Sequence, residues 1–271
     1  MAYIEDNGVK LWYEITGKGE PLVLTGGFGC LHNQWDWIMD ILNEDFQVIN
    51  WNYRGSGQSD RYWGGGYSLD RWVDDLECIL DHLDLKEVNL WGTSTGSPLT
   101  IRYVAKYQER VKSMTTYPMF KADTAFRKAF LTFQDIGESF GYEALATFTS
   151  WIGVASSHQN TDFGNKLAIH EAGLFKANFD MEALAKTLDT FMHFQLRSEL
   201  EKISVPTLLL LGSSGMLGAE MPSVTQLMDE FRQYCPHTKV TTIPDAGGTY
   251  CMYEEPKATA EALKAFIDQI P

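Results

Sequence analysis

The chain has 271 residues, of which 44% are hydrophobic and 13% aromatic, and its formal net charge at pH 7 is -14. This length and apolar content suffice for one large domain with a full core and a lined pocket, and they exclude a disordered chain. Nucleic acids and anionic membranes bind clustered Lys and Arg, so the acidic balance argues against both as partners. A small apolar ligand or substrate fits this composition better.

The cysteines are too widely spaced to predict a disulfide framework or a metal site. They are Cys30, Cys78, Cys235 and Cys251. A reducing cytoplasm is the expected location, because residues 1–10 lack an apolar leader and no run reaches the ~18 apolar residues of a membrane span. No cofactor or metal is indicated, and the sequence leaves open whether the protein is a monomer or a homodimer.

Strand and helix patterns alternate over the first 120 residues. Strands are predicted at 10–16, 21–25, 47–51, 88–91 and 111–117. Helices are predicted at 34–42, 69–83 and 97–106, the last beginning near Pro98. The order strand, helix, strand implies a parallel sheet.

The pattern then changes to helices only, which predicts an inserted cap over residues 121–200. Its four helices are predicted at 121–135, 142–152, 162–177 and 181–200. Strands at 206–211 and 239–243 and helices at 222–234 and 256–269 follow. We therefore expect a core made of residues 1–120 and 201–271, with the helical cap between its two parts.

The pentapeptide Gly92-Thr93-Ser94-Thr95-Gly96 follows an apolar strand and precedes a predicted helix. A GxSxG sequence in this setting places its serine on a strained strand-to-helix turn, where the hydroxyl is exposed. Ser94 is therefore the candidate nucleophile. A serine hydroxyl is protonated at neutral pH and needs a neighbouring base to take its proton during attack.

Two further motifs accompany the serine. Residues 22–29, LVLTGGFG, resemble a strand followed by the HGxxG oxyanion loop, and residues 52–60, NYRGSGQSD, resemble a DxRGxGxSD turn. With the order of elements, they make the chain resemble the α/β-hydrolase fold along its whole length. That resemblance implies a mostly parallel central sheet with helices on both faces and an inserted four-helix cap. Size, cap and residues 27–30 are similar to small esterases and to ligand receptors related to strigolactone and karrikin receptors.

The chain departs from this family pattern at three positions. Gly26 stands where the oxyanion loop usually begins with His, Gly215 stands at the acid position, and Gly248 stands at the position of the catalytic His in a segment that resembles IPxAGHxxxxEEP. The resemblance implies that the backbone N–H groups of Phe28 and Thr95 form the oxyanion hole, which side-chain changes leave intact. It also predicts an imidazole-sized space beside Ser94 at Gly248.

A histidine elsewhere would have to replace the missing base. His193 is the leading candidate, with His32 and His158 as the others. The predicted substrate-contacting residues are Gly26, Gly27, Met119, Trp151 and His193. Glu254 and Glu255, just before Pro256, are expected to cap the last helix.

Three functions remain open from the sequence. The first is an enzyme that acts on a small apolar carbonyl compound, either by a lyase, cyclase or isomerase step or with impaired hydrolysis, using pocket shape and the two amides. The second is a receptor that binds an apolar ligand without catalysis. The third is a carboxylesterase or lactonase with a displaced histidine, or an engineered inactive variant of one. The glycines themselves are explained either by widening of a pocket or by deliberate substitution.

Overall fold

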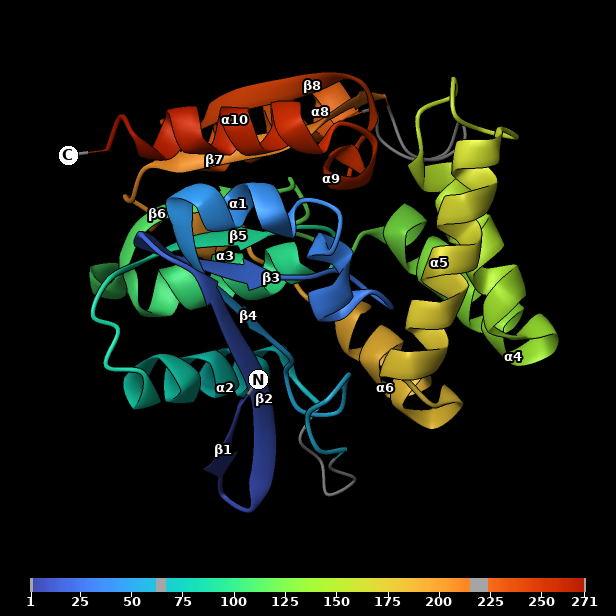
Figure 1. Cartoon of the computed structure of the whole chain (residues 1–271), viewed down its shortest axis with the longest axis horizontal. Helices are drawn as coiled ribbons and strands as arrows, with labels where there is room; N and C mark the ends of the chain where they lie inside the picture. The colour runs from blue at the N-terminus through green and yellow to red at the C-terminus, as the bar shows by residue number, and fades with distance from the viewer. Residues whose placement is uncertain (1, 62–66, 215–223, 271) are drawn as a thin grey trace.

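A mostly parallel sheet organises the protein (Figure 1). The computed structural model describes residues 2–61, 67–214 and 224–270. In these residues the sheet has eight strands in the order β1-β2-β4-β3-β5-β6-β7-β8. The pairs β1–β2 and β2–β4 are antiparallel, and all other neighbouring pairs are parallel. The strands are β1 (Ala2–Asp6), β2 (Val9–Gly17), β3 (Glu20–Thr25), β4 (Phe46–Trp51), β5 (Val88–Gly92), β6 (Val111–Thr116), β7 (Thr207–Ser214) and β8 (Lys239–Gly247).

Helices cover both faces of the sheet, and alternate strand residues pack against them. On one face Leu22 and Leu24 belong to a core shared with α1 (Met39–Asp45) and α10 (Pro256–Ile267). On the other face Val23 belongs to a core shared with α2 (Leu69–His82), α3 (Gly96–Lys106) and α8 (Val224–Tyr234). Burial on both faces explains the nearly continuous apolar runs of these strands. The predicted α/β fold is confirmed.

Every element between β6 and β7 is helical. The helices are α4 (Thr124–Gly153), α5 (Asp162–Asn178), α6 (Met181–Phe191) and α7 (Arg197–Leu200). Figure 1 shows α4, α5 and α6 together at one side of the sheet. Gly141, with φ 85°, interrupts α4. This break agrees with the prediction of two separate helices at 121–135 and 142–152. An antiparallel bridge between Lys121 and Gln195 joins the two ends of the segment.

Several local boundaries differ from the predictions. The strand β1 was not predicted, the helix predicted at 34–42 is a 3-10 turn (Leu31–Trp35) followed by α1, and the helix predicted at 181–200 is divided into α6 and α7. Another 3-10 turn, Gln108–Arg110, precedes β6, and the short helix α9 (Cys251–Glu254) precedes α10.

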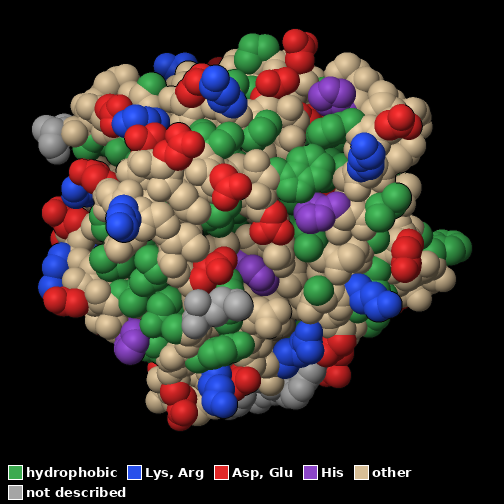
Figure 2. Space-filling model, in the orientation of Figure 1, with side chains coloured by type: hydrophobic (Ala, Val, Ile, Leu, Met, Phe, Trp, Pro, Cys, Tyr) green, Lys and Arg blue, Asp and Glu red, His purple; other side chains and the backbone are tan. Residues whose placement is uncertain are grey.

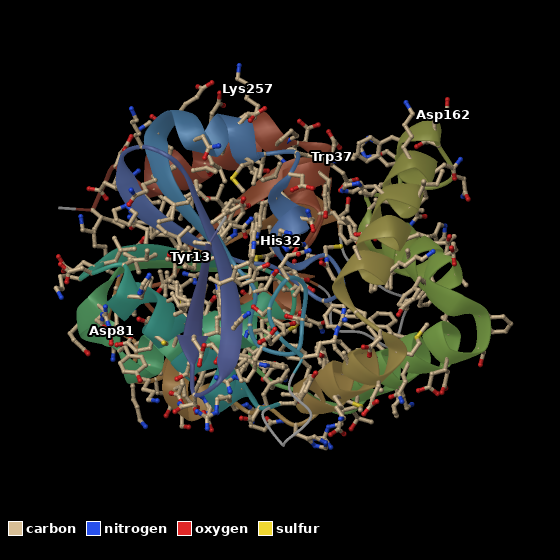
Figure 3. All side chains as sticks on the ribbon, turned by 60° about the horizontal axis from the view of Figure 1, so that its bottom comes forward. Tyr13, His32, Trp37, Asp81, Asp162 and Lys257 are labelled. Atoms are coloured by element: carbon tan, nitrogen blue, oxygen red, sulfur yellow. The ribbon has the colours of Figure 1, made fainter. Side chains whose placement is uncertain are left out.

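The side chain of Trp37 connects α5 to the sheet side of the molecule (Figure 3). Its ring centroid lies 5.8 Å from Phe163 of α5 and 5.3 Å from Tyr253 of α9. Edge-to-face packing of this kind stabilises contacts beyond simple area burial. It fixes α5 beside the carboxyl ends of the strands.

Acidic and basic side chains alternate over the face drawn in Figure 2, without a continuous basic patch. In the described part of the chain, no helix combines the length and apolarity that crossing a membrane requires.

A buried ion pair fixes the turn after β4. Arg54 donates from Nε to Asp75 Oδ1 at 2.8 Å, and its backbone N–H donates to Asp75 Oδ2 at 2.9 Å. The Asp75 side chain has no exposed surface, and that of Arg54 is 4% exposed. Arg54 also pairs with Asp6 of β1 at 2.6 Å, so one guanidinium joins α2, β1 and the β4 turn.

We expect the change Asp75→Asn to lower the free energy of unfolding by about 3 kcal/mol, because it removes the fully buried counter-charge of Arg54 and leaves only the pair with Asp6, whose side chain is 19% exposed. The matched control is Asp74→Asn, which removes the exposed ion pair of Asp74 with Lys106 on the same helix. That change should cost less than about 1 kcal/mol. Urea unfolding of both variants measures the difference, and equal losses would show that burial of the Arg54–Asp75 pair is unimportant.

Candidate active site

Ser94 stands on a strained turn between β5 and α3. Its φ is 51°, in the left-handed region that residues with a side chain rarely adopt. The flanking glycines are explained by space: a Cβ on Gly92 would lie 2.1 Å from Thr100 Oγ1, and one on Gly96 would lie 2.1 Å from the Thr25 carbonyl oxygen. Only glycine permits this packing at both positions, so the GxSxG pattern has a direct steric cause.

The loop after β3 lies directly against the serine. A Cβ on Gly27 would lie 2.7 Å from Ser94 Cβ and 3.2 Å from its Oγ. Gly27 also donates its N–H to the side chain of Gln34, which fixes the loop. Gly26 faces Leu31 and not Ser94: a Cβ on Gly26 would lie 2.0 Å from the Leu31 carbonyl oxygen.

The two amides predicted to form an oxyanion hole remain available. Within the described residues, neither the Phe28 N–H nor the Thr95 N–H donates a hydrogen bond to a protein acceptor. Phe28 belongs to the loop after β3, which lies against Ser94. Thr95 follows Ser94 directly in the chain. Free N–H groups in this position suit a carbonyl oxygen that gains negative charge.

Gly248 follows β8, and the space beside it is occupied. A Cβ on Gly248 would lie 3.2 Å from Tyr117 Oη and 3.3 Å from its Cε2. Tyr117 itself is 4% exposed. The prediction of an imidazole-sized space at this position is therefore wrong: the phenol ring of Tyr117, from the end of β6, fills the direction in which a side chain at position 248 would project.

Ser94 opens into a mostly apolar cavity between the sheet and helices α4 and α5. Tyr117, the predicted contact residue Met119 and Thr249 line its sheet side. Much of the remaining lining is aromatic and comes from the β3 loop, α4, α5 and the segment after β8: Phe28, Phe126, Phe130, Phe133, Phe175 and Tyr250. Lys121 and Asp123 are also part of the lining. An apolar cavity with a few polar groups is the usual form of a small-molecule site.

The cavity lining does not include the predicted contact residues Gly26, His193 and Trp151. The side chain of His193 is 67% exposed and lies 3.4 Å from Asp189. Trp151 is 48% exposed and borders a shallow surface depression with Phe148. The structure thus brings Ser94, Phe28 and Met119 together in one cavity lining, with Gly27 against Ser94, and it leaves His193 and Trp151 at the surface. Gly215, the acid position, lies outside the described residues.

The other histidines proposed as substitutes are engaged elsewhere. His32 is buried, with its ring centroid 4.4 Å from that of Trp12, and burial lowers its pKa to about 4 (Figure 3). His158 forms a 2.6 Å contact from Nδ1 to Glu254. Among the residues that the structure describes, no histidine lines the cavity that contains Ser94.

Glu254 is a structural residue of this site. The expectation that it caps the last helix is wrong, because its side chain is buried and accepts hydrogen bonds from Gly247 N at 2.5 Å and Ala155 N at 2.8 Å. With the contact to His158, this carboxylate joins the end of β8 to the segment after α4. It therefore fixes the turn that precedes Gly248.

Sequence analysis did not identify Glu171 of α5, which lines the same cavity and is 2% exposed. Its Oε2 accepts a hydrogen bond from Ser150 Oγ at 2.5 Å and from Tyr250 Oη at 3.1 Å. Its Oε1 has only the Cys30 thiol, at 3.5 Å. Burial raises the pKa of this carboxyl to about 7. A signal was present in the sequence: Glu171 occupies the apolar face of α5, between Leu167 and Phe175.

The acidic and cysteine side chains do not assemble into a metal site. In the described ranges, no group of three or more His, Cys, Asp or Glu side chains is arranged to hold an ion.

Comparisons with known proteins agree with the fold. A sequence model of the α/β-hydrolase fold family matches residues 22–253. A putative non-heme chloroperoxidase of Synechocystis is 30% identical over 219 residues, which cover 76% of this chain and 78% of that protein. A putative carbamate hydrolase of Azorhizobium caulinodans is 26% identical over 220 residues, covering 77% of this chain and 78% of the relative.

Solved structures of similar shape include the enol-lactonase from Burkholderia xenovorans. It has a TM-score of 0.83 at 20% identity and covers 99% of this chain and 100% of its own. An esterase from Exiguobacterium antarcticum has a TM-score of 0.84 at 18% identity, over 98% of this chain and 99% of its own. Likeness at this identity supports the fold only. Because the family model spans most of the sequence, the chain belongs to the α/β-hydrolase fold family.

Proposed function

We propose that the protein acts on a small apolar molecule with a carbonyl group, and that it does so without efficient acyl transfer through Ser94. The observation that carries the proposal is the contact between Gly248 and Tyr117. In a serine hydrolase the base must lie within hydrogen-bond reach of the nucleophile, and an imidazole fulfils this role in the Ser-His-Asp triad. Here position 248 carries no side chain, and the group that lies against it is the Tyr117 phenol, which, unlike imidazole, does not accept a proton near neutral pH.

The cavity retains the features needed to bind and polarise a carbonyl group. Its aromatic walls match an apolar substrate, and the free amides of Phe28 and Thr95 are placed beside Ser94. Electrostatic stabilisation of a developing oxyanion contributes to catalysis even without a nucleophile. A lyase, cyclase or isomerase step is therefore the reaction class that we favour.

Hydrolysis is the second candidate function. It is favoured by the names of relatives and structural neighbours, which include a carbamate hydrolase, an enol-lactonase and esterases. A third outcome, recovery of the purified protein with a bound ligand that it never converts, would favour a receptor. Hydrolysis of p-nitrophenyl acetate separates the first two: vigorous turnover that is lost in the variant Ser94→Ala would contradict the proposal and favour an esterase or lactonase.

A triad can be rebuilt as a test of the blocked histidine position. We expect the pair Gly248→His and Gly215→Asp to raise p-nitrophenyl acetate hydrolysis little while Tyr117 remains, because the new imidazole would collide with its ring. Adding Tyr117→Ala should raise the rate by about 10²-fold or more, the usual contribution of a general base. The control is Tyr117→Ala alone. An equal gain with and without Tyr117 would show that the ring does not block the position.

Chemical rescue gives a second test of the same space. In the variant Tyr117→Ala, removal of the phenol opens room beside Ser94, and we expect added imidazole to accelerate ester hydrolysis in a saturable manner. The unmodified protein should show no such saturation, because Tyr117 fills the space. Steady-state rates as a function of imidazole concentration provide the measurement, and linear dependence in both proteins, as for the reaction in solution, would contradict the assignment.

A further inference from the structure

The buried carboxyl group of Glu171 has no ionic partner. Among the described residues its contacts are the hydroxyls of Ser150, Tyr250 and Thr149 and the thiol of Cys30, all of them neutral groups. A carboxylate that is taken out of water without a cation costs several kcal/mol. An uncharged side chain would join α5 to α4 at a lower cost in free energy. An acid at this position therefore calls for a functional explanation.

The two oxygens of this carboxyl group differ in their surroundings. The hydroxyls of Ser150 and Tyr250 both donate to Oε2, and the Thr149 hydroxyl lies 3.5 Å from it. Oε1 has only a thiol contact. Thiols are weak donors, so Oε1 keeps its capacity to bind a proton. The hydroxyls hold the carboxyl group in one orientation, as a positioned general acid or base requires.

We propose that Glu171 is the proton acceptor and donor for a reaction at the carbon atom next to a carbonyl group whose oxygen binds the amides of Phe28 and Thr95. This inference rests on the proposed function, and it names the residue that performs the chemistry. Glu171, Phe28 and Ser94 line one cavity, so a single small substrate can reach both the carboxyl group and the amide side of the site.

The proposed step is an enolisation. The Glu171 carboxylate takes a proton from the α carbon, the C–H electron pair becomes a C=C bond, and the C=O π electrons move to the oxygen. The resulting enolate is stabilised by the two N–H groups. Return of the proton from the Glu171 carboxylic acid to a carbon atom completes an isomerisation. In an elimination, the C=O bond re-forms, a C=C bond forms between the α and β carbons, the β substituent leaves with its bonding electrons, and the Glu171 proton passes to that leaving group.

Protonation near neutral pH suits this role, because burial raises the pKa of Glu171 to about 7. The titratable groups that face it are Cys30 from the loop after β3 and Tyr250 beside α9, and burial raises the pKa of both well above their usual values. Burial also raises the pKa of Tyr253 well above its usual value. The charge of Asp36 also raises the pKa of Cys30. Lys121 and Asp123 border the cavity.

The test uses 2-tetralone, an apolar ketone with acidic α protons, in D2O. NMR measures the rate at which the α protons exchange for deuterium. We expect the protein to accelerate exchange and the variant Glu171→Gln to lose about 10²-fold or more of that acceleration. The matched control is Asp162→Asn, an exposed acid at the far end of the same helix (Figure 3), which should retain the full rate.

The pH profile distinguishes catalysis from a structural role. Exchange should rise with pH and level off above an apparent pKa near 7, because the ionised carboxylate is the form that takes the proton. The variant Glu171→Asp keeps a carboxyl group and should retain part of the rate with the same direction of pH dependence. An unchanged rate in Glu171→Gln, a profile without a step near neutral pH, or no acceleration by the unmodified protein would each overturn the inference.

Thermal unfolding supplies a readout that needs no substrate. The folded pKa of Glu171 lies above its unfolded value, so the folded state holds a proton that the unfolded state has released. Stability should therefore decrease as pH rises from about 5 to about 8, and this decrease should be smaller in Glu171→Gln. Equal slopes of melting temperature against pH in both proteins would overturn the assignment of the neutral-pH titration to Glu171.

The two proposals fail separately. Absence of exchange together with weak ester hydrolysis overturns the role of Glu171 and leaves the non-hydrolytic function in place. Vigorous ester hydrolysis that depends on Ser94 overturns the proposed function itself.

Discussion

The close approach of the β3 loop to the β5 turn is the constraint on which this site depends. Ser94 adopts a left-handed backbone conformation, and Gly27 lies so near that a Cβ would be 2.7 Å from the serine Cβ. This geometry places Ser94 against the loop that contains Phe28, and Thr95 follows the serine directly. The strain has a cost of about 1–3 kcal/mol, which the two cores on either side of the sheet must offset.

The backbone around Gly248 is held in place, and a neighbouring side chain packs against it. The end of β8 is fixed by Glu254 through Gly247 and Ala155, and Tyr117 projects into the space next to Gly248. Buried hydrogen bonds of a charged acceptor are strong, so the turn has little freedom to move. The Tyr117 ring thus packs against the backbone at Gly248, next to the cavity that Tyr117 and Thr249 line.

The sequence predicted those features that depend on local pattern. The apolar runs of β3 and β5, the GxSxG turn and the helical stretch between β6 and β7 all follow from residue spacing, and the structure has them at nearly the expected bounds. The edge strand β1 escaped prediction because its five residues include only one that is fully buried. The sequence predicted two separate helices at 121–135 and 142–152, and the structure has a break at Gly141, whose φ of 85° favours glycine.

What the sequence could not predict depends on distances between separate elements. Tyr117 follows β6 and Gly248 follows β8, and β7 lies between these strands in the sheet. Their contact appears only when side-chain directions at the strand ends are known. The surface position of His193 could not be predicted for the same reason. Helix periodicity shows on which face of a helix a residue lies, but it does not show which element covers that face. Glu171 differs from these cases: an acid on the apolar face of α5 was visible in the sequence and predicts a buried polar contact.

The placement of Glu171 and the amides gives the proposed enolisation a favourable balance of charge. Before reaction, the negative charge lies on a carboxylate that burial destabilises. As the proton moves, that charge leaves Oε1 and develops on the substrate oxygen, where the N–H groups of Phe28 and Thr95 receive it. The net charge of the cavity stays constant, while its location changes from a poorly solvated group to one with oriented dipoles. Interactions that strengthen only as the transition state forms accelerate the chemical step. A carboxyl group buried among neutral donors therefore serves this chemistry better than an exposed one, whose solvation would stabilise the reactant state.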